Sequence, residues 1–314
     1  MRALLLVNPT ATTTTKRTRD VLIRALGAAV DLSVEETGYR GHAAALAGTA
    51  RGKGFDVVAV LGGDGTINEA VNGLMAEDSE RDAADRPALM VIPGGSANVF
   101  ARALGLPNNA VEATGVVLEA LREGRRRTVG LGRAIGAEGG RYFTFCAGVG
   151  YDAEVVRAVE ALRGAGHRAG PILYAGTAVR HYFLTDRRVP ALRLERPGHR
   201  PEDGLFMAII SNTAPWTYAG SWPINPTPWA GFTTGLDLLG LKRMGLPTMA
   251  WVLPQVLRPR DTLLRGRHLV QAHDEEEFTL IAKRPIAFQL DGDYLGERER
   301  VTFRSVPNAL RVIV

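Results

Sequence analysis

The sequence contains very little cysteine and no long apolar segment. Cys146 is the only cysteine in 314 residues, which excludes an intramolecular disulfide and any metal site built from several thiolates. No apolar run approaches the roughly 18 residues of a membrane-spanning helix. The N-terminal MRALLLVNPT also lacks the long apolar region and small-residue cleavage site of a signal peptide. A reducing cytoplasmic location is therefore expected, with ALLLV as a buried first strand.

Lysine is scarce as well, and arginine supplies most of the positive charge behind the formal net charge of +5. A basic excess of this size suits nucleic acid, anionic lipid or phosphate ligands. No basic stripe is interleaved with aromatic residues, so a nucleic-acid partner is not expected. The run 125–127, three consecutive arginines, is typical of a solvated helix end.

The first 125 residues alternate between strand and helix patterns. Short apolar strands are predicted at 3–7, 31–36, 56–61 and 88–92, with helices at 16–30 and 41–51. Continuous apolar strands alternating with helices indicate a parallel sheet covered on both faces. In such sheets ligands bind beyond the carboxyl ends of the strands.

After Gly124 the pattern changes to strands separated by turns. Strands are predicted at 141–148, 191–196, 204–212, 277–282, 286–293 and 309–314, and helices at 152–163, 172–184 and 246–257. The sequence thus predicts an α/β protein of two domains. Residues 1–127 form a doubly wound parallel-sheet domain, and residues 128–314 form a mostly antiparallel β-sandwich domain.

Two glycine loops each follow a buried strand and open a helix. They are Gly62-Gly63-Asp64-Gly65-Thr66 and Gly94-Gly95-Ser96-Ala97-Asn98. A helix N-terminus offers unpaired N–H groups, and glycine lets the backbone approach a ligand, so the two loops could hold a polyphosphate between them. Thr66 and Ser96 are also good N-caps, which is the structural alternative.

Asp64 narrows the choice of ligand. A carboxylate among phosphate-binding amides is repulsive unless a divalent cation or a substrate hydroxyl lies between them. Mg²⁺ commonly uses one or two carboxylates together with substrate phosphates, so Asp64 is a candidate metal ligand. No P-loop motif occurs. GVGYDA (148–153) fits a dinucleotide fingerprint, but the acidic residue expected about twenty positions later is absent.

GGDGTINEAVNGL (62–74) resembles the signature of the diacylglycerol kinase and sphingosine kinase catalytic family. Further matches occur in the expected order along the chain: VNPTA (7–11), TGYRGHAAALA (37–47), IPGGSANVFARALGLP (92–107), AGVGYDAEVV (147–156) and LDGDYLG (290–296). NAD kinases and 6-phosphofructokinases share only the GGDG turn. The matches to the diacylglycerol kinase and sphingosine kinase family lie between residues 7 and 296, so this resemblance extends over nearly the whole chain.

The resemblance implies a first domain of the NAD kinase and phosphofructokinase type that binds ATP with Mg²⁺, and a second domain that helps to bind lipid. The residues that it assigns to the nucleotide, together with those of the second glycine loop, are Asn8, Pro9, Thr10, Thr37, Gly62, Gly63, Asp64, Gly65, Thr66, Ile67, Asn68, Gly95, Ser96 and Asn98.

The resemblance also places a catalytic acid in the late segment Asp291-Gly292-Asp293. Asp293 stands where bacterial members have glutamate, one methylene longer. Asp291 and Asp64 are the other candidates for proton acceptor or metal ligand, and Asp152 is the next carboxylate to consider. The alternative for LDGDYLG is a plain hairpin turn.

Three departures from the family pattern stand out. NPTATTTTKR lacks the glycine of the first turn, and Val99 replaces an aspartate after the second loop. Thr233 and Thr234 replace an acidic turn, so no structural Mg²⁺ is expected there.

All four tryptophans lie within 36 residues: Trp216, Trp222, Trp229 and Trp251. Any one of them could fill a core, but together in a proline-rich loop they are typical of a lipid or membrane contact. Trp216, Trp222 and Trp229, with Asp152, are the candidate lipid surface. Docking on an anionic membrane follows from the basic excess. A homodimer could form through an edge strand.

The sequence therefore predicts a cytoplasmic lipid kinase, peripherally associated with the inner face of the membrane. It would transfer the γ-phosphate of Mg-ATP to a lipid hydroxyl, most readily diacylglycerol, giving phosphatidic acid. The alternatives are a sphingoid or ceramide kinase, an NAD kinase, and a nucleotide-binding regulator without catalytic activity.

Overall fold

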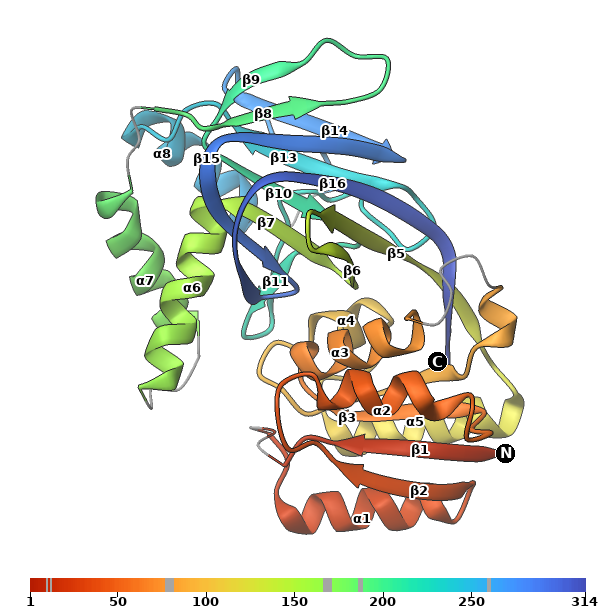
Figure 1. The fold of residues 1–314 in the computed structure, drawn as a ribbon. Coiled ribbons are helices and arrows are strands. Elements are labelled where there is room, and N and C mark those ends of the chain that lie inside the picture. The colour runs from red at the N-terminus through yellow and green to blue at the C-terminus, as the bar shows by residue number, and fades with distance from the viewer. Residues whose placement is uncertain (10, 12, 77–81, 166–170, 186–188, 259–260) are drawn as a thin grey trace. The chain divides into compact units, whose positions relative to one another are not determined.

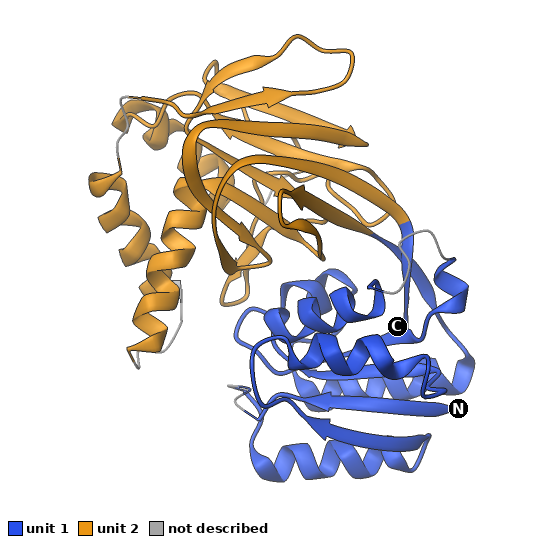
Figure 2. Cartoon of the chain, viewed as in Figure 1, with its two compact units in different colours: residues 1–130, 308–314 blue, residues 131–307 orange. Residues whose placement is uncertain are grey.

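The chain is represented by a computed structural model, which describes all residues except 10, 12, 77–81, 166–170, 186–188 and 259–260 (Figure 1). It divides into two compact units, coloured in Figure 2. Unit 1 comprises Met1–Gly130 and Asn308–Val314, and unit 2 comprises Leu131–Pro307. Within the described residues, no helix combines the length and apolar character needed to cross a bilayer.

Unit 1 is built on a parallel sheet with helices between its strands. Its elements are β1 (Arg2–Val7), α1 (Lys16–Gly27), β2 (Asp31–Glu36), α2 (His42–Ala50), β3 (Val57–Gly62), α3 (Asp64–Leu74), the 3₁₀ turn η1 (Ala83–Asp85), β4 (Ala88–Pro93), α4 (Val99–Ala103) and α5 (Ala110–Glu123). The strand order is β2-β1-β3-β4. Every residue of β3 and β4 is buried, as the continuous apolar runs predicted.

A fifth strand of the unit 1 sheet comes from the end of the chain. The last residues of β16 (Asp293–Val312) run parallel to β4, with Val312 beside Leu89. Leu310 and Ile313 are buried there. The sequence-based boundary assigned 128–314 to the second domain, whereas 308–314 lie in unit 1. A short apolar strand pattern does not say which sheet the strand joins.

Helices α2 and α3 pack at very short range. A Cβ on Gly73 of α3 would collide with the carbonyl oxygen of Ala44, so the interface requires glycine. Glu69, also on α3, accepts hydrogen bonds from the backbone N–H groups of Gly41 (2.8 Å) and Ala43 (3.3 Å). A carboxylate of α3 therefore caps the N-terminus of α2.

Unit 2 consists mostly of antiparallel strands. Its elements are β5 (Arg127–Gly136, starting in unit 1), β6 (Gly139–Phe143), β7 (Cys146–Gly150), α6 (Tyr151–Gly164), α7 (Pro171–Leu184), β8 (Leu192–Glu195), β9 (Glu202–Leu205), β10 (Met207–Ser211), β11 (Thr217–Ala219), β12 (Trp222–Ile224), β13 (Leu236–Leu241), α8 (Leu246–Leu257), β14 (Leu269–Glu275), β15 (Glu277–Leu290) and most of β16. The central order is β14-β13-β10-β7-β15-β16.

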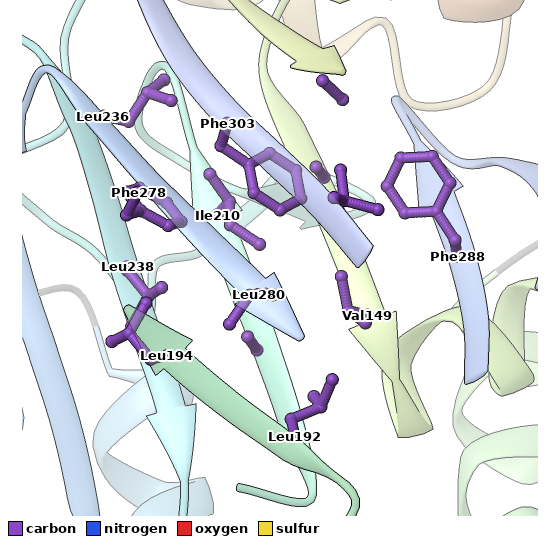
Figure 3. Packing of buried hydrophobic residues seen from close by; sticks show 14 of the residues in the cluster. Val149, Leu192, Leu194, Ile210, Leu236, Leu238, Phe278, Leu280, Phe288 and Phe303 are labelled. Atoms are coloured by element: carbon purple, nitrogen blue, oxygen red, sulfur yellow. The ribbon is translucent and has the colours of Figure 1, made fainter. Parts of the chain in front are cut away.

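Strand β15 pairs with β16 along one edge and with two different strands along the other. Its first half pairs with β8 and its second half with β7, with a register shift between Ile281 and Ile286. The curled sheet therefore closes over one apolar core, which includes Phe278 and Phe288 of β15 and Phe303 of β16 (Figure 3). The predicted fold class, a parallel α/β sheet followed by antiparallel strands, is confirmed.

Several predicted boundaries were wrong for local reasons. The strand predicted at 141–148 is broken between β6 and β7, because the amides of Thr144 and Phe145 bond to a side chain instead of a neighbouring strand. The strand predicted at 286–293 ends at Leu290, where the chain turns. The first helix ends at Gly27, three residues earlier than predicted.

Candidate active site

The two glycine loops meet at the carboxyl edge of the unit 1 sheet. Gly94 N–H donates to the Gly62 carbonyl at 2.8 Å, across the ends of β4 and β3. A Cβ on Gly95 would lie only 2.7 Å from the Cα of Gly63. Backbone contact between the loops thus requires these glycines, independently of any ligand.

The first turn, after β1, lies against both loops. Asn8 donates through its Nδ2 to the Thr66 Oγ1 at 2.9 Å, and through its backbone N–H to Leu61 at 3.0 Å. Thr13 N–H donates to the Gly94 carbonyl at 3.2 Å. Thr37, at the end of β2, donates to Val7. The structure therefore gathers predicted nucleotide residues from four strand ends.

The remaining predicted nucleotide residues differ in accessibility. Pro9 and Ser96 are exposed, whereas Ile67 and Asn68 are buried in α3. Gly63, Asp64, Gly65, Thr66 and Gly95 are half-buried. Thr10 lies outside the described residues. The groups accessible to a phosphate here are thus chiefly backbone amides and hydroxyls.

Thr66 and Ser96 are not the N-caps that the sequence suggested. Helix α3 starts at Asp64 with Gly63 as its N-cap, so Thr66 lies inside the first turn and accepts from Asn8. Helix α4 is capped by Asn98, two residues beyond Ser96. The N-cap positions, Gly63 and Asn98, thus differ from those that side-chain preference alone predicts.

Asp64 links the two glycine loops. Its carboxylate accepts hydrogen bonds from the backbone N–H groups of Val99 (3.0 Å) and Phe100 (3.2 Å), in the first turn of α4. An aspartate that opens one helix therefore caps the next. This contact gives Asp64 a structural role, and its role as a metal ligand stays a prediction.

Asp64→Ala is expected to lower the free energy of unfolding by about 1–2 kcal/mol, because two amides of α4 lose their acceptor. Asp64→Asn keeps one side-chain oxygen and is expected to lose about half as much. Urea denaturation of both variants measures this. An alanine variant as stable as the wild type would contradict the capping role.

Asn98 holds the second loop in shape. It is buried and has a positive φ of 48°, a conformation that asparagine tolerates. Its Oδ1 accepts from Gly95 N–H at 2.8 Å, and its Nδ2 donates to the Gly95 carbonyl at 2.8 Å and to the Asn108 Oδ1 at 2.7 Å. Asn108 was not identified from sequence, because nothing there distinguishes it from an ordinary turn residue.

In unit 2 the segment Asp291-Gly292-Asp293 is a tight hairpin between β15 and β16. Leu290 pairs with Asp293, and the two residues between them have φ values of 50° and 81°. Positive φ at both positions defines the favoured two-residue hairpin turn. The hairpin predicted as the structural alternative is confirmed, and a catalytic role for the same segment stays a prediction.

The side chain of Asp291 has a structural role. The buried carboxylate accepts from the backbone N–H groups of Thr144 (2.6 Å), Phe145 (3.0 Å) and Cys146 (3.0 Å), and from the Thr144 hydroxyl (2.8 Å). Burial raises the pKa of Asp291, while these bonds oppose that rise. Asp291 thus fastens the hairpin to the start of β7.

Asp293 is in a different environment. Its side chain is 27% exposed, and Arg141 Nη2 lies 4.0 Å from its Oδ2. Of the two hairpin aspartates, Asp293 is therefore the one that a substrate can reach.

Asp152, in the first turn of α6, belongs to a buried polar cluster. Its carboxylate accepts from the Gln289 Nε2 at 2.9 Å, and the Gln289 Oε1 accepts from Gly292 N–H at 2.9 Å. A side chain on Gly148 would occupy the same space. Gln289 therefore couples Asp152 to the hairpin that carries Asp293, a link that the sequence did not reveal. Asp152 itself is buried, which distinguishes it from a surface lipid contact.

Burial raises the pKa of Asp152 from 3.8 to about 6, although the bond from Gln289 opposes this. Because the folded-state pKa lies above the unfolded one, this group stabilises the fold fully below about pH 4. That contribution disappears as the pH rises through about 6. Asp152→Asn is expected to remove this dependence and to be up to about 3 kcal/mol more stable at pH 7. Urea titrations at pH 4.5 and 7 test it, and parallel pH dependence in both proteins would contradict it.

The four tryptophans separate into two groups. Trp216 packs against an apolar cluster that contains Tyr182, Met244 and Val252. Trp222, Trp229 and Trp251 are 51%, 44% and 62% exposed. Core filling therefore applies to Trp216, while the others present their rings to solvent.

No group of three or more histidine, cysteine, aspartate or glutamate side chains within the described residues could hold a metal ion.

Residues 2–134 match the family model described as "Diacylglycerol kinase catalytic domain". The chain is 29% identical over 310 residues to the diacylglycerol kinase of Bacillus subtilis (strain 168), covering 94% of this chain and 90% of the relative. A solved structure titled a putative diacylglycerol kinase from Bacillus anthracis str. Sterne is 21% identical, with a TM-score of 0.75 over 99% of this chain and 96% of that one. An NAD kinase from Archaeoglobus fulgidus in complex with ATP is 12% identical, with a TM-score of 0.53 over 100% of this chain and 94% of that one.

The two solved structures are similar in fold, at identities too low to indicate more than the fold. The family match and the full-length relative confirm the predicted resemblance to the diacylglycerol kinase family. The chain is a phosphotransferase with an alcohol acceptor. More particularly, residues 2–134 resemble the catalytic domain of diacylglycerol kinases, and the chain as a whole is similar to a bacterial diacylglycerol kinase.

Proposed function

We propose that this enzyme transfers the γ-phosphate of Mg-ATP to the hydroxyl of diacylglycerol and gives phosphatidic acid. Unit 1 would bind the nucleotide and unit 2 the lipid. The observation that carries the proposal is the backbone contact between the two glycine loops, where Gly94 N–H bonds to Gly62. It places the two glycine loops and the N-terminus of α3 together at one edge of a parallel sheet, an arrangement suited to a polyphosphate.

The residues of unit 1 fit a triphosphate. Gly63, Gly65 and Gly95 are accessible and carry no Cβ, and Thr66 and Ser96 add hydroxyl donors. Asn8 orients the Thr66 hydroxyl from the first turn. Mg²⁺, when bound, would neutralise phosphate charge. Asp64 is the carboxylate of these loops that would serve as its ligand.

Asp293 is the proposed proton acceptor for the lipid hydroxyl. The need is general: a carboxylate must take the hydroxyl proton as the new phosphate ester bond forms. Asp293 is partly exposed, whereas Asp291 already accepts four hydrogen bonds. The exposed Trp222 and Trp229 would contribute to lipid contact at the inner face of an anionic membrane.

The proposal is tested by supplying ATP labelled at the γ-phosphate, with Mg²⁺, to diacylglycerol, a sphingoid base, ceramide and NAD in parallel mixed-micelle reactions. Labelled phosphatidic acid is the expected product. A labelled sphingoid or ceramide product would keep the kinase class but change the acceptor. Labelled NAD alone would assign the soluble dinucleotide instead. ATP binding without any product would indicate a regulator.

A further inference from the structure

Helix α8 of unit 2 has two apolar stripes where a surface helix needs one. Met249, Val252 and Val256 face the apolar cluster beneath it. Leu246, Leu253 and Leu257, at i, i+7 and i+11, lie on another face and are 63%, 49% and 40% exposed. The outward face of α8 is therefore apolar as well.

The composition of α8 is equally unusual for an exposed helix. Its twelve residues, LPTMAWVLPQVL, contain no charged side chain. A helix that is apolar all round belongs in a core or at a membrane. At 1.5 Å per residue α8 is about 18 Å long, too short for the roughly 30 Å hydrocarbon core of a bilayer. An orientation parallel to the membrane plane fits that length.

The three exposed tryptophans, of which Trp251 belongs to α8, have indole N–H groups that already donate hydrogen bonds. Trp222 donates to the backbone carbonyl of Leu257 (2.6 Å), Trp229 to that of Asp261 (2.6 Å), and Trp251 to that of Arg265 (2.8 Å). Burial of an unpaired donor would cost free energy in an apolar phase. Here the rings are exposed while their donors are already paired, so lipid can cover them without that cost.

Four exposed arginines, the arginine rim, precede and follow α8 in the chain. Arg243 precedes α8, and Arg258, Arg265 and Arg267 follow it, all of them exposed. These four form no ion pair with carboxylates of the described residues. Lys242 N–H bonds to the His268 carbonyl, which sets Arg243 near Arg267. Gln255 bonds to both backbone groups of Arg265, which holds the returning chain against α8.

The sequence from 242 to 267 carries six basic residues and one acidic residue, a net +5 that equals the formal excess of the whole chain. An apolar helix with an arginine rim is complementary to an anionic bilayer surface.

We infer that α8 is a membrane-docking helix. It lies in the interface of an anionic bilayer, with Leu246, Leu253 and Leu257 in the acyl region and the arginine rim on the headgroups. This deepens the proposed function, and rests on it, by naming the element that brings the enzyme to its lipid substrate.

The test is sedimentation with vesicles, without ATP, comparing phosphatidylcholine alone with phosphatidylcholine that contains phosphatidylglycerol. Wild-type protein is expected to bind the anionic vesicles and to be released by salt. The double variant Leu253→Asp, Leu257→Asp is expected to bind about tenfold more weakly for each leucine replaced. The matched control is Val111→Asp, at a valine of α5 that is 53% exposed, which should bind as the wild type does.

Kinase activity on a short-chain diacylglycerol, dispersed as monomers, separates the two proposals. The double variant should keep this activity, because the substrate needs no bilayer. Vesicle binding without any activity on this substrate would overturn the proposed function and leave the docking helix standing. Equal vesicle binding by wild type and double variant would overturn the docking helix. A concentration-dependent dimer that the same two substitutions dissociate would also overturn the docking helix. A second copy of the chain would then cover the apolar face of α8.

Discussion

Asp293→Asn is expected to lower kcat by about 10²- to 10⁴-fold, the contribution of a positioned general base. The free energy of unfolding should stay within about 0.5 kcal/mol of the wild type, because the carboxylate is partly exposed and its neighbour Arg141 is 4.0 Å away. Steady-state kinetics with diacylglycerol in micelles, together with urea denaturation, measures both quantities.

The matched comparison is Asp291→Asn, two residues away in the same hairpin. An amide cannot accept all four hydrogen bonds from Thr144, Phe145 and Cys146, so a loss of about 2–4 kcal/mol in stability is expected. If Asp293→Asn turned over normally and a stable Asp291→Asn did not, the roles of the two aspartates would have to be exchanged.

Gly95→Ala is the second substitution with a large expected effect. Its Cβ would lie 2.7 Å from the Cα of Gly63 and 3.0 Å from the Asn98 Oδ1, so the two glycine loops must separate. Overpacking of this kind costs about 1–3 kcal/mol. Displaced loops should also weaken ATP binding by about tenfold or more. Urea denaturation and the KM for ATP report the two effects.

Gly115→Ala provides the control. Gly115 lies within α5, and a Cβ at this position would meet no atom within 4 Å, so alanine should stabilise the protein by about 0.5–1 kcal/mol through helix propensity. Its KM for ATP should not change. A Gly95→Ala protein with normal stability and normal KM would show that the loops tolerate separation.

The parallel half of the fold could be predicted because its signals are local. β3 and β4 are continuous apolar runs followed by glycine, and both the strands and the loop positions follow from that pattern. The hairpin at Asp291-Gly292 could also be predicted, since both residues tolerate positive φ.

The roles of individual polar residues could not be predicted in the same way. Asp64 and Glu69 lie five positions apart in one motif, yet each accepts from the first amides of a different helix, α4 or α2. Gln289 joins Asp152 to Gly292 across more than a hundred residues. Such contacts depend on where distant segments come together, and a glutamine or glutamate gives no local signal of its partner.

The strand at 308–314 has a consequence for how the chain folds during synthesis. Ile313 N–H bonds to the Leu89 carbonyl, and Arg311 donates to the carbonyls of Ala84 and Arg86. These contacts hold residues 311–313 against β4 and the segment before it, which precede the whole of unit 2 in the chain. The edge of β4 therefore stays unpaired while the whole of unit 2 is translated, and a nascent chain stalled before residue 308 would expose it to other chains.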